Sequence, residues 1–473
     1  MHLLTTSYNI KDNKSKKVGF LIPDGIGIRN YLFSPIIPHI LEQNNKVIVL
    51  HNLPKHVIQK KAEDKLPNLN FLTAEVAPEL IGERFIREAT TYGRLKINSI
   101  RKSNPTILRN WKKHNLTWKQ KLLYLAAAVV GSFFKTYKKI HEWEKKREQI
   151  IRKGKLYKIA KKQLNELKLD SLLCTHQRVP FATAYMLAAK DLGITTYTAI
   201  YSWDNLPKAR LVMSSDYYLV WSTYMKRELR DYYPHIEEKS IIITGTPQFD
   251  FYQDSKLILD RKSFANEYNL NPHKKWVLYS GDDPKTSPYD ADYLNDIATA
   301  LAKETDIQVL FRQAPVEDIK RYQNTLDVHP IIKHIPPKWE KGKTWSLFTP
   351  TKEDIQLLVN LSMHCHVVVN VGSTMALDFA HFDRPGVYIN YDQPHAQNWS
   401  VDIIYQFEHF KTMNGLDAVG WINSKDEILN VIRKAIDAPD SIAPDRMQWK
   451  KRIAGTHKVL ASEQIAKKLQ ENF

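Results

Sequence analysis

Short runs of β-branched and other apolar residues alternate with longer amphipathic stretches along most of the chain. This alternation is typical of βαβ units, in which helices join parallel strands. In the first half, strands are predicted at Val18–Ile22, Lys46–Leu50, Ser171–Cys174, Thr195–Ile200, Tyr217–Trp221 and Ile241–Thr244. After a polar connection at 254–274, the pattern predicts strands at Trp276–Ser280, Gln308–Phe311, Val367–Asn370 and Gly386–Asn390, with helices at Tyr293–Ala302 and Lys352–Met363. The fold class is therefore α/β, with two doubly wound domains.

The length of 473 residues also favours two domains of about 200 residues each. We place the first at 1–255, with a basic, helix-rich insertion at 94–162, and the second at 256–445. The remaining stretch, 446–473, is rich in Lys and Ala and predicts one or two helices. Whether these helices return to the first domain stays open.

Positive charge is concentrated in the insertion. The net charge is +18, and residues 94–162 hold 21 Lys and Arg against three acidic residues, so the rest of the chain is neutral. The apolar run at Leu122–Phe134 is shorter than the roughly 20 residues that span a bilayer. Aromatic residues among the lysines are typical of a segment that lies in the interface of an anionic membrane. A buried helix with solvated basic neighbours remains the alternative, and nucleic acid is not expected, because no recognised binding motif accompanies the charge.

The cellular location is expected to be cytoplasmic, on the inner face of the membrane. Residues 1–17 lack the basic start and apolar segment of a secretory signal. The two cysteines, Cys174 and Cys365, lie within predicted strands, which suits a reducing compartment better than a disulfide.

Polar residues follow several strands of the first domain, where open parallel sheets bind their ligands. Asp24 and His176 are candidates to take a proton from an acceptor hydroxyl, although each is also a plausible turn or capping residue. Gly25 and Gly27 let backbone approach a ligand closely. Gly25 and Gly27 are therefore counted with the donor-binding candidates, whereas Asp204 and Asn205, which follow the next strand, are candidates for the acceptor side.

The second domain offers candidate anion ligands at the same edge of its sheet. Ser280 and Gly281 end one strand, and Arg312 ends the next, where a guanidinium suits a phosphate and a salt bridge is the alternative. The strand that ends at Asn370 passes through Gly372, Ser373 and Thr374 directly into a helix. Backbone amides and hydroxyls at a helix start bind anions, although an ordinary N-cap has the same composition.

These motifs resemble the GT-B superfamily over nearly the whole chain apart from the insertion. The segment Asn370–Asp378 followed by Arg384-Pro385 resembles CDP-glycerol glycerophosphotransferases, and Gly245–Asp250 is similar to the end of the first domain in bacterial surface-polysaccharide transferases. The resemblance implies two Rossmann-like domains facing across a cleft, with the donor nucleotide on the second. It adds three donor-side residues, Thr349, Asp354 and Asp378.

The resemblance implies a glycosyltransferase that moves a sugar from a nucleotide donor to a glycan or lipid-linked acceptor in envelope polysaccharide assembly. The chain has no His-Gly dipeptide of the kind that supplies the base in the glycerophosphotransferases. The segment Phe311–Pro315 also lacks the histidine of the Arg-x-His-Pro element of those enzymes. Both differences favour sugar transfer over glycerol-phosphate transfer. An Asp after the first strand is the base in some inverting GT-B enzymes, so Asp24 ranks above His176 by analogy. Asp290-Ala291-Asp292 matches a metal-binding Asp-x-Asp tripeptide, but such a match is expected by chance in a chain of this length. Neither metal nor cofactor is therefore expected.

Three alternatives stay open. They are a polyol-phosphate transferase, a nucleotide-sugar epimerase on the same fold, and a polyanion-binding protein on a degenerate transferase scaffold. The nucleotide, the sugar, the acceptor, the stereochemical course and the oligomeric state are not determined by these motifs.

Overall fold

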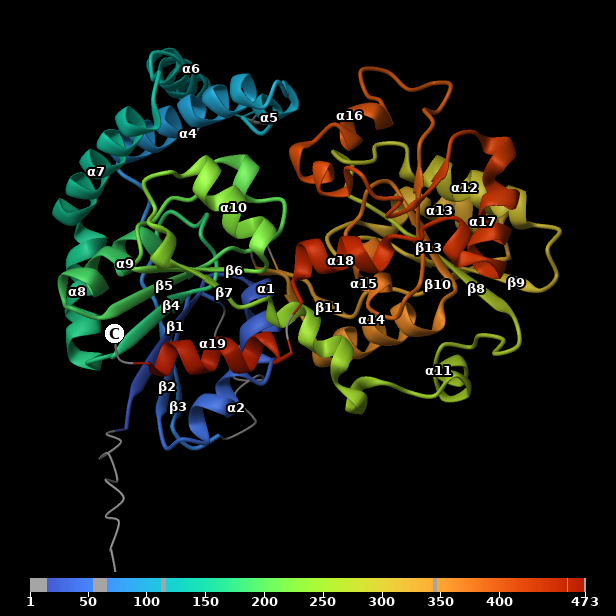
Figure 1. The fold of residues 1–473 in the computed structure, drawn as a ribbon, viewed down its shortest axis with the longest axis horizontal. Coiled ribbons are helices and arrows are strands. Elements are labelled where there is room, and N and C mark those ends of the chain that lie inside the picture. The colour runs from blue at the N-terminus through green and yellow to red at the C-terminus, as the bar shows by residue number, and fades with distance from the viewer. Residues whose placement is uncertain (1–14, 54–65, 112–115, 343–346, 457, 472–473) are drawn as a thin grey trace, which may run out of the picture.

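The computed structural model describes residues 15–53, 66–111, 116–342, 347–456 and 458–471, and the N-terminal segment considered above lies largely outside this range. Two α/β domains lie side by side, each built around a parallel sheet (Figure 1). The architecture predicted from the hydrophobic pattern is therefore confirmed.

The first domain contains a seven-stranded sheet in the order β3-β2-β1-β4-β5-β6-β7. All of its neighbouring strands are parallel. The pattern missed β3, because an edge strand is only partly covered and shows no continuous apolar run. The strands are β1 (Lys17–Ile22), β2 (Lys46–His51), β3 (Leu69–Thr73), β4 (Ser171–Cys174), β5 (Thr195–Ala199), β6 (Tyr217–Val220) and β7 (Ile241–Ile243).

The second domain contains a six-stranded parallel sheet in the order β10-β9-β8-β13-β14-β15. Its two edge strands have three residues each and were not predicted. The strands are β8 (Lys275–Ser280), β9 (Ile307–Arg312), β10 (Ile332–His334), β13 (Val367–Asn370), β14 (Gly386–Ile389) and β15 (Gly420–Ile422), beside a separate antiparallel hairpin of β11 (Trp339–Glu340) and β12 (Thr349–Pro350).

Helices cover both sheets. In the first domain they are α1 (Gly25–Gly27), α2 (Ile36–Leu41), α9 (Ala182–Asp191) and α10 (Thr223–Tyr232), with a π-helical turn at Ile28–Leu32. In the second they are α11 (Arg261–Glu267), α12 (Asp290–Leu301), α13 (Gln323–Val328), α14 (Lys352–His364), α15 (Met375–Ala380), α16 (Val401–Tyr405) and α17 (Ile428–Asp437).

The basic insertion forms a layer of helices on the outer side of the first domain (Figure 1). The helices of this layer extend over 81–167, beyond the predicted bounds of 94–162. The predicted bounds followed the run of basic residues, and the helices begin before that run and end after it. Several basic side chains are internal: Arg94 is 1% exposed and pairs with Glu144 at 2.7 Å. The helices are α4 (Ile81–Arg101), α5 (Thr106–Arg109), α6 (Trp118–Ser132), α7 (Tyr137–Lys153) and α8 (Lys155–Leu167). None of the helices in the described ranges is long and apolar enough to cross a bilayer.

Two helices end the chain, and the second returns to the first domain. α18 (Arg446–Ala454) packs on α15, and α19 (Ala461–Gln470) packs on α2. The carboxylate of Asp250 accepts hydrogen bonds from the backbone amides of Ala461 and Ser462, at 3.0 and 2.7 Å. This contact caps the start of α19. The crossing that the sequence left open is therefore present.

Candidate active site

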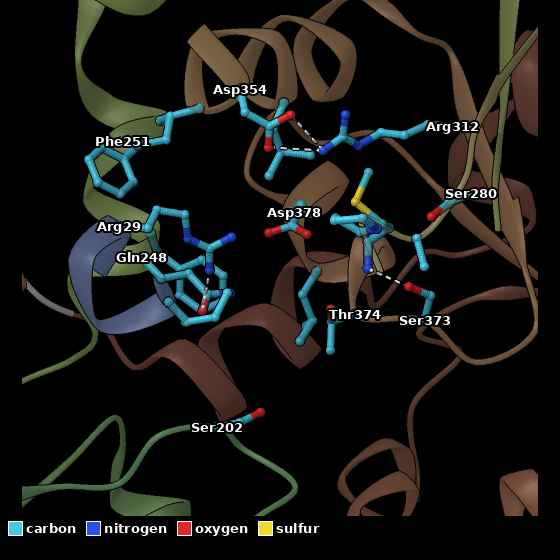
Figure 2. Close-up of a pocket in the computed structure, with 18 of the residues that line it drawn as sticks. Arg29, Ser202, Gln248, Phe251, Ser280, Arg312, Asp354, Ser373, Thr374 and Asp378 are labelled. Carbon is cyan, nitrogen blue, oxygen red and sulfur yellow. Dashed lines mark hydrogen bonds and ion pairs between the residues drawn. The ribbon is translucent and has the colours of Figure 1, made fainter. Parts of the chain in front are cut away.

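A cavity of about 300 Å³ lies between the two domains, beyond the carboxyl ends of both sheets (Figure 2). Open parallel sheets bind their ligands at this edge. The first domain contributes residues that include Ile26, Arg29, Tyr201, Ser202 and Gln248, and the second contributes residues that include Ser280, Gly281, Arg312, Asp354, Ser373, Thr374 and Asp378. Seven of the predicted donor-side residues therefore lie together in one cavity.

Arg312 is held at the cavity by a buried ion pair. One of its terminal nitrogens, Nη2, donates to both carboxylate oxygens of Asp354 at 3.0 Å. Asp354 also accepts hydrogen bonds from the Lys338 amide and the Trp339 indole, each at 2.7 Å. The other terminal nitrogen of Arg312, Nη1, is buried and has no hydrogen-bond partner within the described ranges. The salt bridge considered as the alternative for Arg312 is thus present, and it leaves a donor group free for a ligand.

The segment from Asn370 to Thr374 forms a tight turn into α15. Gly372 has φ +71°, a region that favours glycine, and an added Cβ would lie 2.8 Å from the Phe410 ring. The side-chain oxygen Oδ1 of Asn370 accepts a hydrogen bond from the backbone amide of Ser373 at 2.7 Å. Thr374 makes no side-chain cap in the described structure, and the Ser373 hydroxyl accepts a long hydrogen bond of 3.5 Å from the Met375 amide. Both residues line the cavity, so capping of the helix is weak here.

Asp378 lies between cations from the two domains (Figure 2). It accepts a hydrogen bond from the Tyr252 hydroxyl at 2.8 Å. Burial raises the pKa of Asp378 to about 6, and the Tyr252 hydrogen bond and the charges of Arg29 and Arg312 oppose that rise. A group that titrates near neutral pH therefore faces the cavity.

Arg29 is a cavity residue that the sequence analysis did not select. It follows the glycine loop on the π-helical turn, and it donates to Asn30 at 2.9 Å and to Gln248 at 3.4 Å. It forms no ion pair with any described carboxylate. Its place in the loop after the first strand was the available signal, because that loop lies at the ligand-binding edge.

Asp282 was also overlooked, although it directly follows Ser280 and Gly281. It lines the cavity, and burial together with the neighbouring carboxylates of Asp283 and Asp290 raises its pKa to about 8. The cavity therefore contains two carboxyl groups that hold protons more tightly than usual.

Asp24 and His176, predicted as alternative bases, form one hydrogen-bonded pair. Nδ1 of His176 lies 2.5 Å from Oδ2 of Asp24, and Oδ1 of Asp24 accepts from the Gly27 amide at 2.9 Å. Nε2 of His176 is buried without a partner among the described groups. The imidazole stacks on Tyr201, with ring centroids 3.9 Å apart, and Tyr201 lines the cavity. The pair thus borders the cavity without being among the described residues that line it.

Gly25, Gly27 and Thr349 are packed against protein. A Cβ on Gly25 would lie 1.9 Å from the Phe348 carbonyl oxygen of the second domain, and one on Gly27 would lie 2.8 Å from Ile22 and from Thr175. Thr349 is fully buried in the hairpin. At these three positions the chain packs closely against other parts of the protein. None of the three is among the described residues that line the cavity.

The predicted acceptor-side residues are bonded to their neighbours. Asp204 pairs with Lys208, and the Asn205 amide donates to Asp204 at 2.7 Å. Although Asp204 is buried, the charge of Lys208 holds its pKa well below the usual range. The residues of this loop that line the cavity are Tyr201, Ser202 and Trp203.

Potential metal ligands gather at one place in the described structure, away from the cavity. They are His141, Glu144 and His235, and Glu144 already pairs with Arg94. Asp290, from the Asp-x-Asp match, is buried and accepts from the hydroxyls of Tyr279 and Tyr322 at 2.8 and 2.7 Å. Its carboxylate therefore supports the fold.

Comparison with known proteins connects this site to transferases. Residues 183–409 match the family model of CDP-Glycerol:Poly(glycerophosphate) glycerophosphotransferase, and this range includes Arg312, Asp354 and the turn from Asn370 to Thr374. A search of curated proteins finds no match.

Solved structures show the same fold at low identity. The chain is similar to the UDP-GlcNAc 2-epimerase from Methanocaldococcus jannaschii, with 13% identity, a TM-score of 0.52, and 96% of this chain and 99% of that chain covered. It is also similar to a putative UDP-N-acetylglucosamine 2-epimerase from Listeria monocytogenes, with 9% identity, a TM-score of 0.53, and 96% of each chain covered. A glycosyltransferase from Rickettsia africae has 10% identity and a TM-score of 0.50, with 97% of this chain and 100% of that chain covered. These likenesses show the fold, two Rossmann-like domains of the GT-B kind, and the family model covers just under half of the chain.

Proposed function

We propose that the protein transfers a sugar from a nucleotide diphosphate donor to a hydroxyl group of a glycan or lipid-linked acceptor. One observation carries the proposal: Arg29 and Arg312, from opposite domains, reach the same cavity, and Nη1 of Arg312 is buried without a partner in the described structure. An anion with several oxygens would satisfy both guanidinium groups at once. The diphosphate of an activated donor has this chemistry.

In the proposed reaction, the acceptor oxygen forms a bond to the anomeric carbon of the donor sugar. The bond from that carbon to the phosphate oxygen breaks, and the nucleoside diphosphate leaves with the electron pair. Arg29 and Arg312 stabilise the negative charge that develops on it. The Ser373 and Thr374 hydroxyls are positioned to donate to the same phosphates.

We assign the base to Nε2 of His176, with Asp24 as its positioning residue. The order expected by analogy, with Asp24 first, is reversed because both Asp24 oxygens already accept hydrogen bonds. In this arrangement, the acceptor proton moves to Nε2, and Asp24 stabilises the imidazolium that results. The reaction is proposed to occur in the cytoplasm, where the free, buried thiols of Cys174 and Cys365 are stable.

A polyol-phosphate transferase is the second candidate, and the family match favours it. Here the acceptor oxygen would bond to the β-phosphorus, and a nucleoside monophosphate would leave. The histidine of the Arg-x-His-Pro element is absent, because Ala314 stands in its place and Gln313 occupies the preceding, variable position. Gln313 is hydrogen-bonded to Nε2 of His334 at 2.6 Å, so an imidazole still lies beside this loop.

A panel of UDP-sugars, CDP-glycerol and the free nucleotides tests the proposal by thermal shift, because a ligand of the folded state raises its apparent stability. Turnover then identifies the leaving group. A nucleoside diphosphate supports sugar transfer, and a nucleoside monophosphate supports the second candidate. Conversion of one nucleotide-sugar into another without acceptor would assign an epimerase. Polyanion binding without any nucleotide effect would exclude all three enzymes.

A further inference from the structure

The outer face of α6 exposes a continuous row of large apolar side chains. Trp118, Leu122, Leu125, Val129 and Phe133 are 66%, 57%, 64%, 52% and 72% exposed. With about 100° of rotation per helical residue, the five side chains fall within an arc of about 80°. Isolated exposed apolar residues are ordinary, but an aligned row of this kind marks an interaction surface.

The opposite face of α6 accounts for its packing on the protein. Ala127 and Gly131 are buried against α4, where a Cβ on Gly131 would lie 2.4 Å from the Ala89 carbonyl oxygen. Tyr124 is also buried on this side. The exposed row is therefore not required for the contact with α4, which small residues make at close range.

The stretch of sequence around the row carries only positive charge. Residues 89–141 contain 12 Lys and Arg and no Asp or Glu. Two exposed lysines, Lys119 and Lys121, flank the apolar arc on its two sides, at about 40° from its edges by helical geometry. Lysines at the border of an apolar face place their ammonium groups at the level of lipid phosphates while their stems cover apolar surface.

We propose that the apolar face of α6 docks into the interfacial layer of an anionic lipid bilayer, with the helix axis parallel to the membrane. Trp118 and Phe133 lie at the two ends of the row, and the flanking lysines contact the headgroups. A second copy of this chain is a poor occupant, because it would bring the same positive charge to the contact. The proposal narrows the expected membrane contact of residues 94–162 to one helix face.

The same helical layer reaches the second domain. At the corner between α4 and α5, the Asn104 amide donates to the Gln406 carbonyl oxygen at 2.9 Å and to the Glu408 carboxylate at 2.8 Å. Figure 1 shows α6 beside this corner, at the outer edge of the first domain. A docked α6 would hold both domains near the bilayer, which suits a lipid-linked acceptor; this consequence alone rests on the proposed function.

Binding of the full chain to sedimented vesicles tests the proposal. We expect binding to phosphatidylcholine vesicles that contain about one-third phosphatidylglycerol, weakened by salt, and little binding to phosphatidylcholine alone. Leu125→Asp should reduce the affinity at least about tenfold, because it places a charge within the apolar row. The double variant Lys119→Glu/Lys121→Glu should reduce both the affinity and its salt dependence.

Val328→Asp is the matched control, because Val328 is 68% exposed on the second domain and should leave vesicle binding unchanged. Wild-type protein that does not bind anionic vesicles at low salt would overturn the proposal, as would equal binding by the Leu125 and Val328 variants. Self-association without lipid that Leu125→Asp abolishes would assign the face to a second copy instead. Vesicle binding needs no turnover, so these outcomes are independent of the proposed function.

Discussion

The second-domain wall of the cavity carries a buried nitrogen that has no hydrogen-bond partner among the described residues. It belongs to Arg312, which Asp354 holds through the other terminal nitrogen, and Ser373 and Thr374 line the same wall. Behind the first-domain wall, the predicted residues already have protein partners: Asp24 is bonded to His176, and Asp204 is paired with Lys208.

This difference indicates a division of labour between the domains. A preformed cluster of donors on the second domain suits the binding of an anionic donor with little rearrangement. The first domain contributes Arg29, which is held only by neutral side chains, and a His-Asp pair behind Tyr201. Changes on the second domain should therefore weaken donor binding, whereas changes on the first domain should reduce turnover.

The largest effect is expected from the His-Asp pair. His176→Asn should lower kcat by about 10²–10⁴-fold, the usual contribution of a general base, and should leave the donor Kd unchanged. Asp24→Asn should lower kcat less, since His176 remains, and should alter the pH profile of kcat. Steady-state kinetics with a titration of donor binding measure both effects. Unchanged turnover in His176→Asn would exclude His176 as the base.

Arg312→Ala is expected to act on the second-domain wall through stability as well as binding. It leaves the buried Asp354 carboxylate without its cation, which should cost about 3 kcal/mol of unfolding free energy. Donor-induced stabilisation should disappear. The double variant Arg312→Ala/Asp354→Asn is the control: it should recover part of the stability in denaturant unfolding but none of the donor binding. Recovery of binding in that variant would show that Arg312 only neutralises Asp354.

The carboxyl group of Asp378, between Arg29 and Arg312, should make the unfolding free energy depend on pH. Its folded-state pKa of about 6 lies above the ordinary value of 3.8, so the folded protein holds this proton more tightly than the unfolded chain. The contribution to stability is complete below about pH 4 and is lost as pH rises through 6, by up to about 3 kcal/mol. Asp378→Asn should remove this dependence.

Unfolding free energies of wild type and Asp378→Asn at pH 4 and pH 7 measure the difference. Asp282→Asn should also reduce the slope between pH 4 and 7, because the pKa of Asp282, about 8, likewise lies above its ordinary value, but only this variant should also lose the dependence between pH 6 and 8. The same slope between pH 4 and 7 in wild type and Asp378→Asn would contradict the prediction.

The sequence was sufficient to predict the two parallel sheets and most of the second-domain wall. Continuous apolar strands such as Val367–Asn370 are buried on both faces, so local pattern and fold agree there. The turn at Gly372 needs glycine for its φ angle, which is a local property that the sequence displays directly.

The first-domain wall could not be predicted in the same way, because it depends on contacts between distant segments. Gly25 looked like a ligand loop, but its missing side chain makes room for the Phe348 backbone across the domain boundary. Asp24 and His176 are 152 positions apart in the sequence, which presents them as alternative bases, whereas their side chains lie 2.5 Å apart in the structure. Spacing in sequence carries no information about such pairs.

The smallest expected effect sharpens the comparison between the two arginines. Arg29 is half-buried and has no carboxylate partner in the described chain, so Arg29→Ala should change the unfolding free energy by no more than about 0.5 kcal/mol, in contrast to Arg312→Ala. Loss of charge-assisted hydrogen bonds to the leaving phosphate should still lower kcat about 10- to 100-fold. Arg29→Lys should restore part of this rate, because an ammonium supplies the charge but not the planar pair of donors. If Arg29→Ala weakens donor binding as much as it lowers kcat, Arg29 binds the donor before the reaction as well as during it. Both walls of the cavity would then contribute to donor binding.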